Sequence, residues 1–434
     1  MLLGTMSVNE AGHLCIGGMS TVELAETYGT PLYVLDEDLI RQNCRRYVSA
    51  LDCPGMVAYA AKAFMTVAMA RLVFQEGLGL DVVSGGELYT AIRAGFPPER
   101  IIFNGNNKTP EEICMALRSN VGRIVLDSLD ELDMLTTLAR KLCARPRILL
   151  RLNPGVSAHA HEYVLTGIDD CKFGISVKGG AALSAVKAAL AAEEVKLVGY
   201  HVHIGSQLLD LHAPLLAARV VLHFALLVSE STGYWPEEVD LGGGLGIRYL
   251  LSDRPPEIEQ YVQALTGCVR GFCIEHGKRL PYLLFEPGRS IVGEAGTTLY
   301  TIGSIKRTPG HRNYAAVDGG MTDNPRPALY DAEYHCVLAN RVNDAPVSNY
   351  RIVGKCCESG DVLINEASLP ELRKGDLLAV LSTGAYNYSM ASNYNRVARP
   401  AAVLVSSGQA DLIVAREDFS DLVRLDLLPA RLVG

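Results

Sequence analysis

The sequence predicts a fold of the α/β plus all-β class, in which a (β/α)8 TIM barrel is followed by a second, all-β domain. Between residues 36 and 290, apolar runs of strand length alternate with Ala- and Leu-rich segments of helical spacing. From 291 to 434 the helical spacing fades, and short β-type runs are separated by Gly, Pro, Asn and Asp. Residues 1–35 show similar short runs and turns. We therefore expect a barrel in 36–290 and a β-sandwich or β-barrel-like domain in 291–434, joined by N-terminal strands from 1–35.

Eight segments of the central region have the length and composition of barrel strands. They are residues 57–61, 80–83, 101–103, 123–126, 147–152, 198–202, 238–241 and 283–285. The helical segments expected between them include 65–75, 129–142, 181–192 and 214–229. Strands that alternate with helices pair in parallel, and a count of eight favours closure into a barrel. An open doubly wound sheet is the alternative, but no G-x-G-x-x-G motif follows the first strand.

Five segments of the C-terminal region are expected to be strands of the second domain. They are residues 297–306, 314–317, 347–353, 377–381 and 403–406. Turn-forming residues separate them, as is typical of an all-β domain.

The expected barrel strands all end on residues that can take part in chemistry. In order, these are Lys62, Asp81 with Ser84, Asn104, Asp127, Arg151 with Asn153, His203 with Ser206, the glycines 242–244, and Glu286 with Arg289. A barrel gathers the carboxyl ends of its strands at one rim, so we expect these residues to meet there. One polar strand end is usually a turn or a cap, but eight in register are hard to assign to capping alone.

Lys62 lies where the first strand, 57–61, gives way to the helical segment 65–75. A lysine at this junction can be desolvated by its neighbours, lose its proton near neutral pH and attack a carbonyl as a free amine. Taken alone, the residue could equally be a surface lysine that caps a strand.

The glycine-rich run 242–246 and Glu286 indicate the kind of cofactor that the amine of Lys62 would bind. Barrels commonly bind phosphate with the loops after strands seven and eight, where glycines let backbone N–H groups approach an anion. A tight turn used only for packing is the alternative. Glu286 could pair with Arg289, or it could hold the protonated ring nitrogen of a cofactor. An amine, a phosphate cradle and a carboxylate together specify pyridoxal 5'-phosphate.

His201 and His203 lie on the same side of the sixth strand, because side chains alternate along a strand. His203 suits a ring that lies flat on a planar cofactor, and Ser206 could reach a phosphate. The pair could also bind zinc, but no third ligand is arranged nearby in the sequence, so we expect no metal site.

Composition excludes several classes of function. The net charge of −8 provides no positive field for nucleic acid or for an anionic membrane. No 18-residue apolar run is present, and the N-terminus has no basic start before an apolar stretch, so we expect neither a membrane span nor a signal peptide. The eleven cysteines are scattered without a C-x-x-C pair, which favours reduced thiols in the cytoplasm.

Six motifs, in order, resemble those of the diaminopimelate decarboxylases, which belong to the alanine-racemase-like, fold-type III group of pyridoxal phosphate enzymes. They are Y-A-A-K-A-F at 59–64, H-V-H-I-G-S-Q at 201–207, G-G-G-L-G at 242–246, E-P-G-R at 286–289, C-E-S-G-D at 357–361 and G-A-Y at 384–386. The resemblance covers most of the chain. It implies that Lys62 binds the cofactor covalently, that His203 stacks on its ring, and that Glu286 pairs with the ring nitrogen.

The same resemblance assigns the remaining site residues. The residues expected to bind the cofactor are Lys62, Asp81, Arg151, His203, Ser206, Gly243, Gly244, Glu286, Pro287, Gly288, Arg289 and Tyr386. The residues expected to bind the substrate are Arg289, Arg326, Tyr330, Glu358 and Tyr386. Lys62, His203 and Cys357 are expected to be catalytic, with Cys357 as proton donor, whereas the adjacent Cys356 is expected to serve packing. In this group the cysteine segment reaches the neighbouring subunit's site, which implies a homodimer with shared sites.

The resemblance implies decarboxylation of meso-2,6-diaminopimelate to L-lysine and carbon dioxide, the last step of lysine biosynthesis. Glu286 supports decarboxylation over racemisation, because a carboxylate keeps the ring nitrogen protonated. A related decarboxylase of carrier-bound glutamate, ornithine or arginine is an alternative, although two arginines at the distal end favour a substrate with a second carboxylate. A pyridoxal phosphate-binding regulator without catalysis is a further alternative.

Overall fold

The computed structural model describes residues 2–156, 171–307, 309 and 312–432, and they form two compact units. The barrel unit comprises Arg41–Ile247 and Asp253–Ile291, and the β unit comprises the chain up to Ile40, Arg248–Ser252 and the chain from Val292 onward. The segments 36–40 and 248–252, which we expected in the barrel, thus group with the β unit, whereas Ile291, expected in the β domain, groups with the barrel unit.

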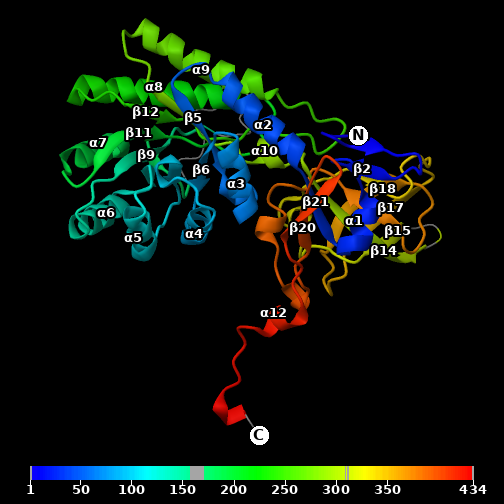
Figure 1. The fold of residues 1–434 in the computed structure, drawn as a ribbon. Coiled ribbons are helices and arrows are strands. Elements are labelled where there is room, and N and C mark those ends of the chain that lie inside the picture. Colours follow the sequence, from blue (N-terminus) through cyan, green and yellow to red (C-terminus); the bar gives the residue numbers. More distant parts are fainter. Residues whose placement is uncertain (1, 157–170, 308, 310–311, 433–434) are drawn as a thin grey trace. The chain divides into compact units, whose positions relative to one another are not determined.

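Eight parallel strands close the barrel, and each lies where the sequence predicted a strand (Figure 1). They are β5 (Gly55–Ala60), β6 (Gly79–Val82), β7 (Ile101–Phe103), β8 (Arg123–Leu126), β9 (Arg147–Asn153), β11 (Lys196–His201), β12 (Glu238–Asp240) and β13 (Tyr282–Phe285). Pairing of β13 with β5 completes the circle, and the two-residue strand β10 (Ile175–Ser176) adds to β9. The predicted barrel is therefore confirmed.

Apolar side chains fill the inside of the barrel. One buried cluster comprises Met56, Ala58, Ile102, Val125, Leu149, Val198 and Leu284. These residues come from different strands and point to the same interior, because alternate side chains of each strand face inward. A filled interior leaves the rim at the strand ends as the place where polar side chains can gather.

Helices surround the barrel strands (Figure 1). Short polar caps fix where several of these helices begin. They are α2 (Glu37–Ala50), α3 (Val67–Gln75), α4 (Gly85–Arg93), α5 (Pro110–Arg118), α6 (Leu129–Lys141), α7 (Ala181–Ala191), α8 (His212–Thr232), α9 (Ile258–Glu275) and α10 (Arg289–Val292), with the 3-10 turns η1 (Ala61–Ala63) and η2 (Pro98–Arg100). Thr66, Ser84, Thr109 and Ser128 each accept a backbone N–H of the helix that follows. The four predicted helices are confirmed.

Helix α8 is long and apolar enough to cross a membrane by length and composition alone, and among the described residues it is the one helix of that kind. Half of its most apolar window is buried. Val221, Leu222 and Ala225 are among its fully buried residues, and the helix packs against α9. These are the features of a helix that covers a protein core.

The β unit is built on one large sheet that includes an N-terminal strand. Its order is β18-β17-β15-β14-β4-β20-β21, and β19 pairs with both β14 and β16. The strands are β4 (Leu32–Asp36), β14 (Gly296–Lys306), β15 (Asn313–Val317), β16 (Cys336–Leu338), β17 (Ser348–Val353), β18 (Val362–Leu369), β19 (Leu377–Val380), β20 (Ala401–Ser406) and β21 (Gln409–Val414). The five predicted C-terminal strands are confirmed, whereas β16, β18 and β21 were not predicted.

The segment 1–35 differs from the expectation that it consists of strands. The short strands β1 (Ser7–Val8), β2 (Leu14–Ile16) and β3 (Met19–Ser20) form a small sheet of their own. Helix α1 (Thr21–Tyr28) follows, since Leu24 is fully buried while Glu23 lies in the first turn and favours the positive end of the helix dipole. The remaining elements are α11 (Arg326–Tyr330), α12 (Phe419–Val423), η3 (Tyr388–Met390), η4 (Tyr394–Arg396) and η5 (Ala430–Leu432).

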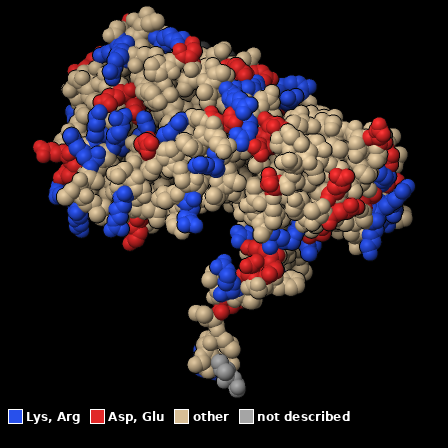
Figure 2. Space-filling model, viewed as in Figure 1, with Lys and Arg blue, Asp and Glu red and all other residues tan. Residues whose placement is uncertain are grey.

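Acidic and basic side chains are interspersed on the face of the molecule shown in Figure 2. No broad basic field covers that face, in keeping with the net charge of −8.

Candidate active site

A cavity of about 630 Å³ opens at the rim where the barrel strands end. Its volume is in the range of small-molecule and cofactor sites. Seven residues that the sequence predicted at the rim line it: Lys62, Asn104, Arg151, Asn153, His203, Ser206 and Glu286. His201 also lines the cavity, whereas Val202 does not, so the predicted alternation along this strand is confirmed.

Lys62 lies in η1, directly after β5, and its amine is held by a buried carboxylate. Its Nζ is 2.9 Å from Oδ2 of Asp81, which is fully buried on the neighbouring strand β6. Burial and the charge of Glu286 raise the pKa of Asp81, and the charge of Lys62 opposes that rise. This contact fixes the amine at the wall of the cavity.

Asn104, at the end of β7, joins two acidic side chains. Its amide nitrogen lies 2.7 Å from Oδ1 of Asp81 and 2.7 Å from Oε1 of Glu286. The side chain is buried. The sequence marked this residue as a polar strand end but gave it no role.

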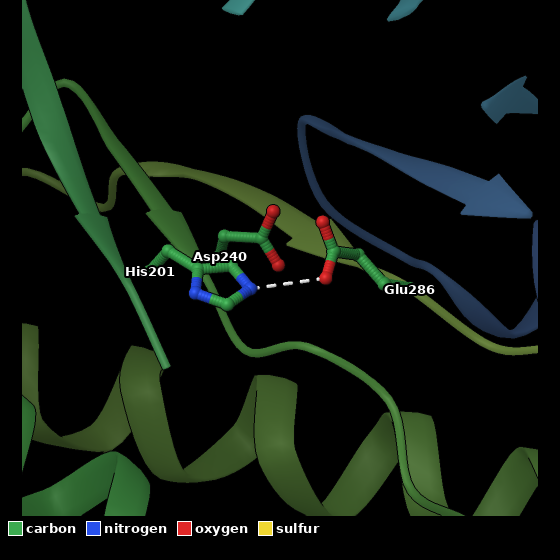
Figure 3. A group of neighbouring side chains, drawn as sticks. All are labelled: His201, Asp240 and Glu286. Carbon is green, nitrogen blue, oxygen red and sulfur yellow. Dashed lines mark hydrogen bonds and ion pairs between the residues drawn. The ribbon is translucent and has the colours of Figure 1, made fainter. Parts of the chain in front are cut away.

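Glu286, which follows β13, is surrounded by hydrogen-bonding and ionisable groups (Figure 3). Nε2 of His201 lies 3.0 Å from its Oε2, and Asp240 at the end of β12 lies beside both. Burial alone would raise the pKa of Glu286, but the charge and hydrogen bond of His201, with the charge of Lys62, lower it to about 2. Burial and the charge of Glu286 instead raise the pKa of Asp240. Glu286 is therefore the anionic member of this group.

Donor atoms of His201, Asp240 and Glu286 lie within 4.8 Å of one another, a spacing that could also suit a metal ion. Two of the three residues are already joined by a hydrogen bond, and the second oxygen of Glu286 accepts one from Asn104. The zinc alternative considered from the sequence paired His201 with His203, and His203 is not in this group. The absence of a metal from the site stays a prediction.

His203 lies two residues beyond β11, half-buried at the cavity wall. Burial, together with the charges of Lys62 and Arg151, lowers its pKa to about 3, so the ring is neutral at physiological pH. The backbone N–H of Gly243 donates to its Nδ1 at 3.4 Å. A neutral ring held in this way can pack against a flat ligand without adding charge.

The glycine loop after β12 lies close to the neighbouring backbone. A Cβ at Gly243 would meet the carbonyl oxygen of Glu286 at 2.1 Å, and Gly244 has a φ of +118°. Packing alone therefore requires glycine at these positions. This agrees with the alternative interpretation of the sequence, in which the glycine run is a tight turn used for packing. Gly243, Gly244, Pro287, Gly288 and Arg289 do not line the cavity itself. Arg289 does bring a guanidinium to Ser206, with its Nε 3.1 Å from the hydroxyl oxygen.

Arg151 on β9 forms part of the cavity wall and is held from two sides. Its guanidinium carbon lies 4.4 Å from the centre of the Phe173 ring. Its Nη1 is 3.7 Å from Oδ1 of Asp127, and the other carboxylate oxygen, Oδ2, accepts the backbone N–H of Gly174 at 3.0 Å. These contacts keep a positive charge beside His203.

Arg326, in α11 of the β unit, is a buried cation with neutral neighbours. Its Nη1 donates to the hydroxyl oxygens of Tyr249 at 2.6 Å and Tyr334 at 3.0 Å, and it lies over both rings. Among the described residues, no carboxylate lies within ion-pair distance of it. The positive charge of Arg326 therefore remains available to an anionic ligand. No motif or pattern in the sequence pointed to either tyrosine.

The other predicted residues of the β unit are more accessible to solvent. Cys357 and Glu358 are exposed in the loop after β17, and the backbone N–H of Cys357 donates to Asn395 at 2.8 Å. The Tyr330 side chain is 63% exposed. Tyr386 has a φ of +63°, which is uncommon for an aromatic residue and marks a strained backbone of the kind found at functional sites.

Known proteins are similar to this chain over nearly its whole length. The pyridoxal binding domain of the pyridoxal-dependent decarboxylases matches residues 37–293. Diaminopimelate decarboxylases of Halalkalibacterium halodurans and Bacillus subtilis are 50% and 49% identical, each over 98% of this chain and 97% and 98% of their own. The chain belongs to the diaminopimelate decarboxylase family. Its fold is that of the crystal structure of the M. jannaschii diaminopimelate decarboxylase in co-complex with L-lysine, with a TM-score of 0.94, 38% identity and coverage of 100% of both chains.

Membership confirms the resemblance seen in the sequence and the prediction of pyridoxal phosphate as cofactor. The arrangement of the cavity fits this cofactor. One wall carries an amine that can bind an aldehyde, and another carries a carboxylate held as an anion, which suits a protonated ring nitrogen.

Proposed function

We propose that this protein decarboxylates meso-2,6-diaminopimelate, giving L-lysine and carbon dioxide, and so performs the last step of lysine biosynthesis. The observation that carries the proposal is the likeness, over 98% of the chain, to diaminopimelate decarboxylases that are 49–50% identical. The solved relative with bound L-lysine, the product expected here, supports it. Decarboxylases of ornithine, arginine or carrier-bound glutamate, and a non-catalytic regulator, are not favoured.

The barrel residues hold the cofactor in this proposal. Lys62 would hold it covalently through its amine, which Asp81 keeps oriented. Glu286, anionic beside His201, holds the proton on the ring nitrogen. The bound cofactor supplies an electron sink for the electron pair that carbon dioxide leaves behind.

The remaining barrel residues position the parts of the cofactor that lie away from Lys62 and Glu286. His203 presents a neutral ring to its face. The phosphate is assigned to Ser206, Arg289, Gly243, Gly244 and the backbone of Pro287 and Gly288. Arg151 is assigned to the cavity wall beside His203.

The β-unit residues select the substrate and deliver a proton. Arg326, whose hydrogen-bond partners among the described residues are neutral tyrosines, binds the distal carboxylate together with Arg289 and Tyr330. Glu358 holds the distal amino group, and Tyr386 contacts both cofactor and substrate. After carbon dioxide leaves, Cys357 donates the proton of its thiol to the α-carbon. A buried arginine favours a substrate with a second carboxylate, which ornithine lacks.

We also infer a homodimer whose two active sites are shared. A proton donor works best where water is excluded, yet Cys357 and Glu358 are exposed in the single chain. A second copy of the chain that covers them would complete the site. All eleven cysteines are free thiols, which supports the expectation that the enzyme acts in the cytoplasm.

Mixing two inactive variants tests the shared site. Lys62→Ala and Cys357→Ala are each expected to be inactive or nearly so. If each site takes its lysine from one subunit and its cysteine from the other, random reassociation should restore about a quarter of the native turnover. No recovery from subunits shown to exchange would contradict shared sites.

One assay tests the proposed reaction. Carbon dioxide release is measured with pyridoxal phosphate present, from meso-diaminopimelate in parallel with ornithine, arginine and glutamate. We expect turnover of meso-diaminopimelate at a kcat/KM at least about a hundredfold above the others. Ornithine and arginine leave the distal arginine unpaired, and glutamate has no distal amino group for Glu358 to hold. Equal or faster turnover of ornithine or arginine would refute the substrate assignment.

A further inference from the structure

Asn104 lies between the two carboxylates that face opposite ends of the proposed cofactor. One N–H of its amide donates to Asp81, which holds the amine of Lys62, and the other donates to Glu286. The three side chains come from the ends of β7 and β6 and from the residue after β13. The amide thus forms a continuous hydrogen-bonded path from Lys62 to Glu286.

The orientation of this amide is dictated by its neighbours. Its Oδ1 is buried and has no hydrogen-bond partner among the residues that the structure describes. A flipped amide would instead place that oxygen against both carboxylates and remove the donor that Asn104 offers to each acid. The structure therefore leaves one acceptor of Asn104 unsatisfied so that both N–H groups can serve the acids, which is an unusual arrangement for a residue that only completes a core.

The charge around Asn104 explains why two donors are needed there. Asp81, Asp240 and Glu286 are all buried at the same end of the barrel. Asp81 has the ammonium of Lys62 as a partner, and Glu286 has the ring of His201. The acids repel one another: the charge of Glu286 raises the pKa of Asp81, and the charges of Glu286 and Asp81 raise the pKa of Asp240. Asn104 supplies a neutral donor to two of them without adding a further charge.

We propose that Asn104 is a positioning residue of the cofactor site, whose amide ties the carboxylate that orients Lys62 to the carboxylate that receives the ring nitrogen. It sets the separation and the direction of these two attachment points by donating a hydrogen bond to each acid. The inference rests on the cofactor-binding roles proposed for Lys62 and Glu286. It adds a residue for which neither the sequence motifs nor the resemblance supplied a role.

Substitution of Asn104 by leucine tests the proposal, because leucine has a similar shape and no donor. Apoprotein is titrated with pyridoxal phosphate, and both the dissociation constant and the absorption spectrum of the bound cofactor are recorded. We expect Asn104→Leu to bind the cofactor about tenfold to a hundredfold more weakly, as for the loss of a hydrogen bond to a charged group, with an altered spectrum. Asn107→Leu, an exposed position on the same loop, is the matched control and should keep native affinity and spectrum.

A double-mutant cycle separates positioning from a general effect on folding. In a Glu286→Gln background one of the two acids is gone, so the further loss caused by Asn104→Leu should shrink to less than about threefold. Equal losses in both backgrounds, or native affinity and spectrum in the single variant, would overturn the proposal. If the leucine variant does not fold, Asn104→Ser, which keeps one donor, replaces it in the same cycle.

The outcome is distinguishable from failure of the proposed function. A native protein that binds no pyridoxal phosphate would contradict the cofactor site as a whole. A native protein that binds it while Asn104→Leu is unchanged would overturn only the role of Asn104.

Discussion

In the barrel unit the assigned side chains contact one another, whereas in the β unit most of them face solvent or neutral partners. Lys62, Asp81, Asn104 and Glu286 form one hydrogen-bonded series at the rim. Cys357, Glu358 and Tyr330 are exposed instead. The barrel residues are therefore positioned by the chain itself. The β-unit residues depend on a ligand, or on a second copy of the chain, to complete their surroundings.

This difference predicts different consequences for substitutions. Changes in the barrel series should affect cofactor binding, because each member fixes the next. Changes at Arg326, Cys357 or Glu358 in the β unit should leave the cofactor in place and affect turnover or substrate binding alone. The predictions that follow test this division, from the largest expected effect on turnover to the smallest.

Lys62→Ala should have the largest effect. Without the amine no covalent attachment of the cofactor can form, so both the absorption of the attached cofactor and carbon dioxide release should be lost. Absorption spectroscopy and a carbon dioxide assay measure the two directly. Lys187→Ala, at an exposed position of α7, is the control and should behave as the native protein. Turnover near the native rate in Lys62→Ala would remove the lysine from the mechanism.

Cys357→Ala should come next and should spare the cofactor. Loss of a positioned proton donor is expected to lower kcat by about 10²- to 10⁴-fold with a much smaller change in KM. Cys356→Ala is the matched control. Burial, with the nearby Asp361 carboxylate, raises the pKa of Cys356 to about 11, and its role in packing leaves turnover nearly unchanged. A rise in KM without a fall in kcat would mean that another group donates the proton.

Arg326→Leu should weaken substrate binding and leave the cofactor spectrum unchanged. Loss of a charged hydrogen bond to the distal carboxylate is expected to raise KM about tenfold to a hundredfold. Tyr334→Phe, which removes one neutral partner of the guanidinium, should raise KM about fivefold. Steady-state kinetics with meso-diaminopimelate measure both. Tyr350→Phe, in the same unit and also buried, is the control. An unchanged KM in Arg326→Leu would place the distal carboxylate elsewhere.

The sequence predicted the barrel and its polar rim because both depend on local patterns. Apolar runs bounded by polar residues are visible in a single segment, and a parallel barrel brings their ends together whatever the partners are. The partners themselves were not predictable. Asn104 is separated in the sequence from Asp81 by 23 residues and from Glu286 by 182, and no local pattern encodes such a contact.

The β unit was predicted less completely, and its missed elements share a physical cause. Strand β21 lies at the edge of the sheet and has no fully buried residue, so the sequence lacks the apolar alternation of a half-buried strand. Strand β18, at the other edge, carries two consecutive exposed residues in its middle. Helix α1 is only eight residues long and was taken for strand and turn. Short or solvent-facing elements give the weakest patterns.

A last comparison concerns the pH dependence of stability, in which the two units should behave alike. Substitutions that test it should change turnover less than those above. Burial raises the pKa of Asp323 in the β unit and of Glu87 in the barrel unit to about 7 each. Both acids therefore hold a proton in the folded protein that they release on unfolding, since unfolded Asp and Glu titrate near about 4. Stability should accordingly be highest below about pH 4 as far as these groups decide it, and should fall as the pH rises from about 4 to about 7.

Asp323→Asn and Glu87→Gln should each reduce this decline, because the neutral amides have no proton to lose. Asp323 accepts hydrogen bonds from Tyr300 and from the backbone N–H of Gly320, so the asparagine variant keeps one oxygen acceptor there. Denaturant unfolding at pH 5 and pH 8 compares the midpoints of the native protein and both variants. A decline as steep in the variants as in the native protein would show that these acids do not titrate between the two pH values. A decline reduced by only one of them would show that the two units differ in how they hold a buried proton.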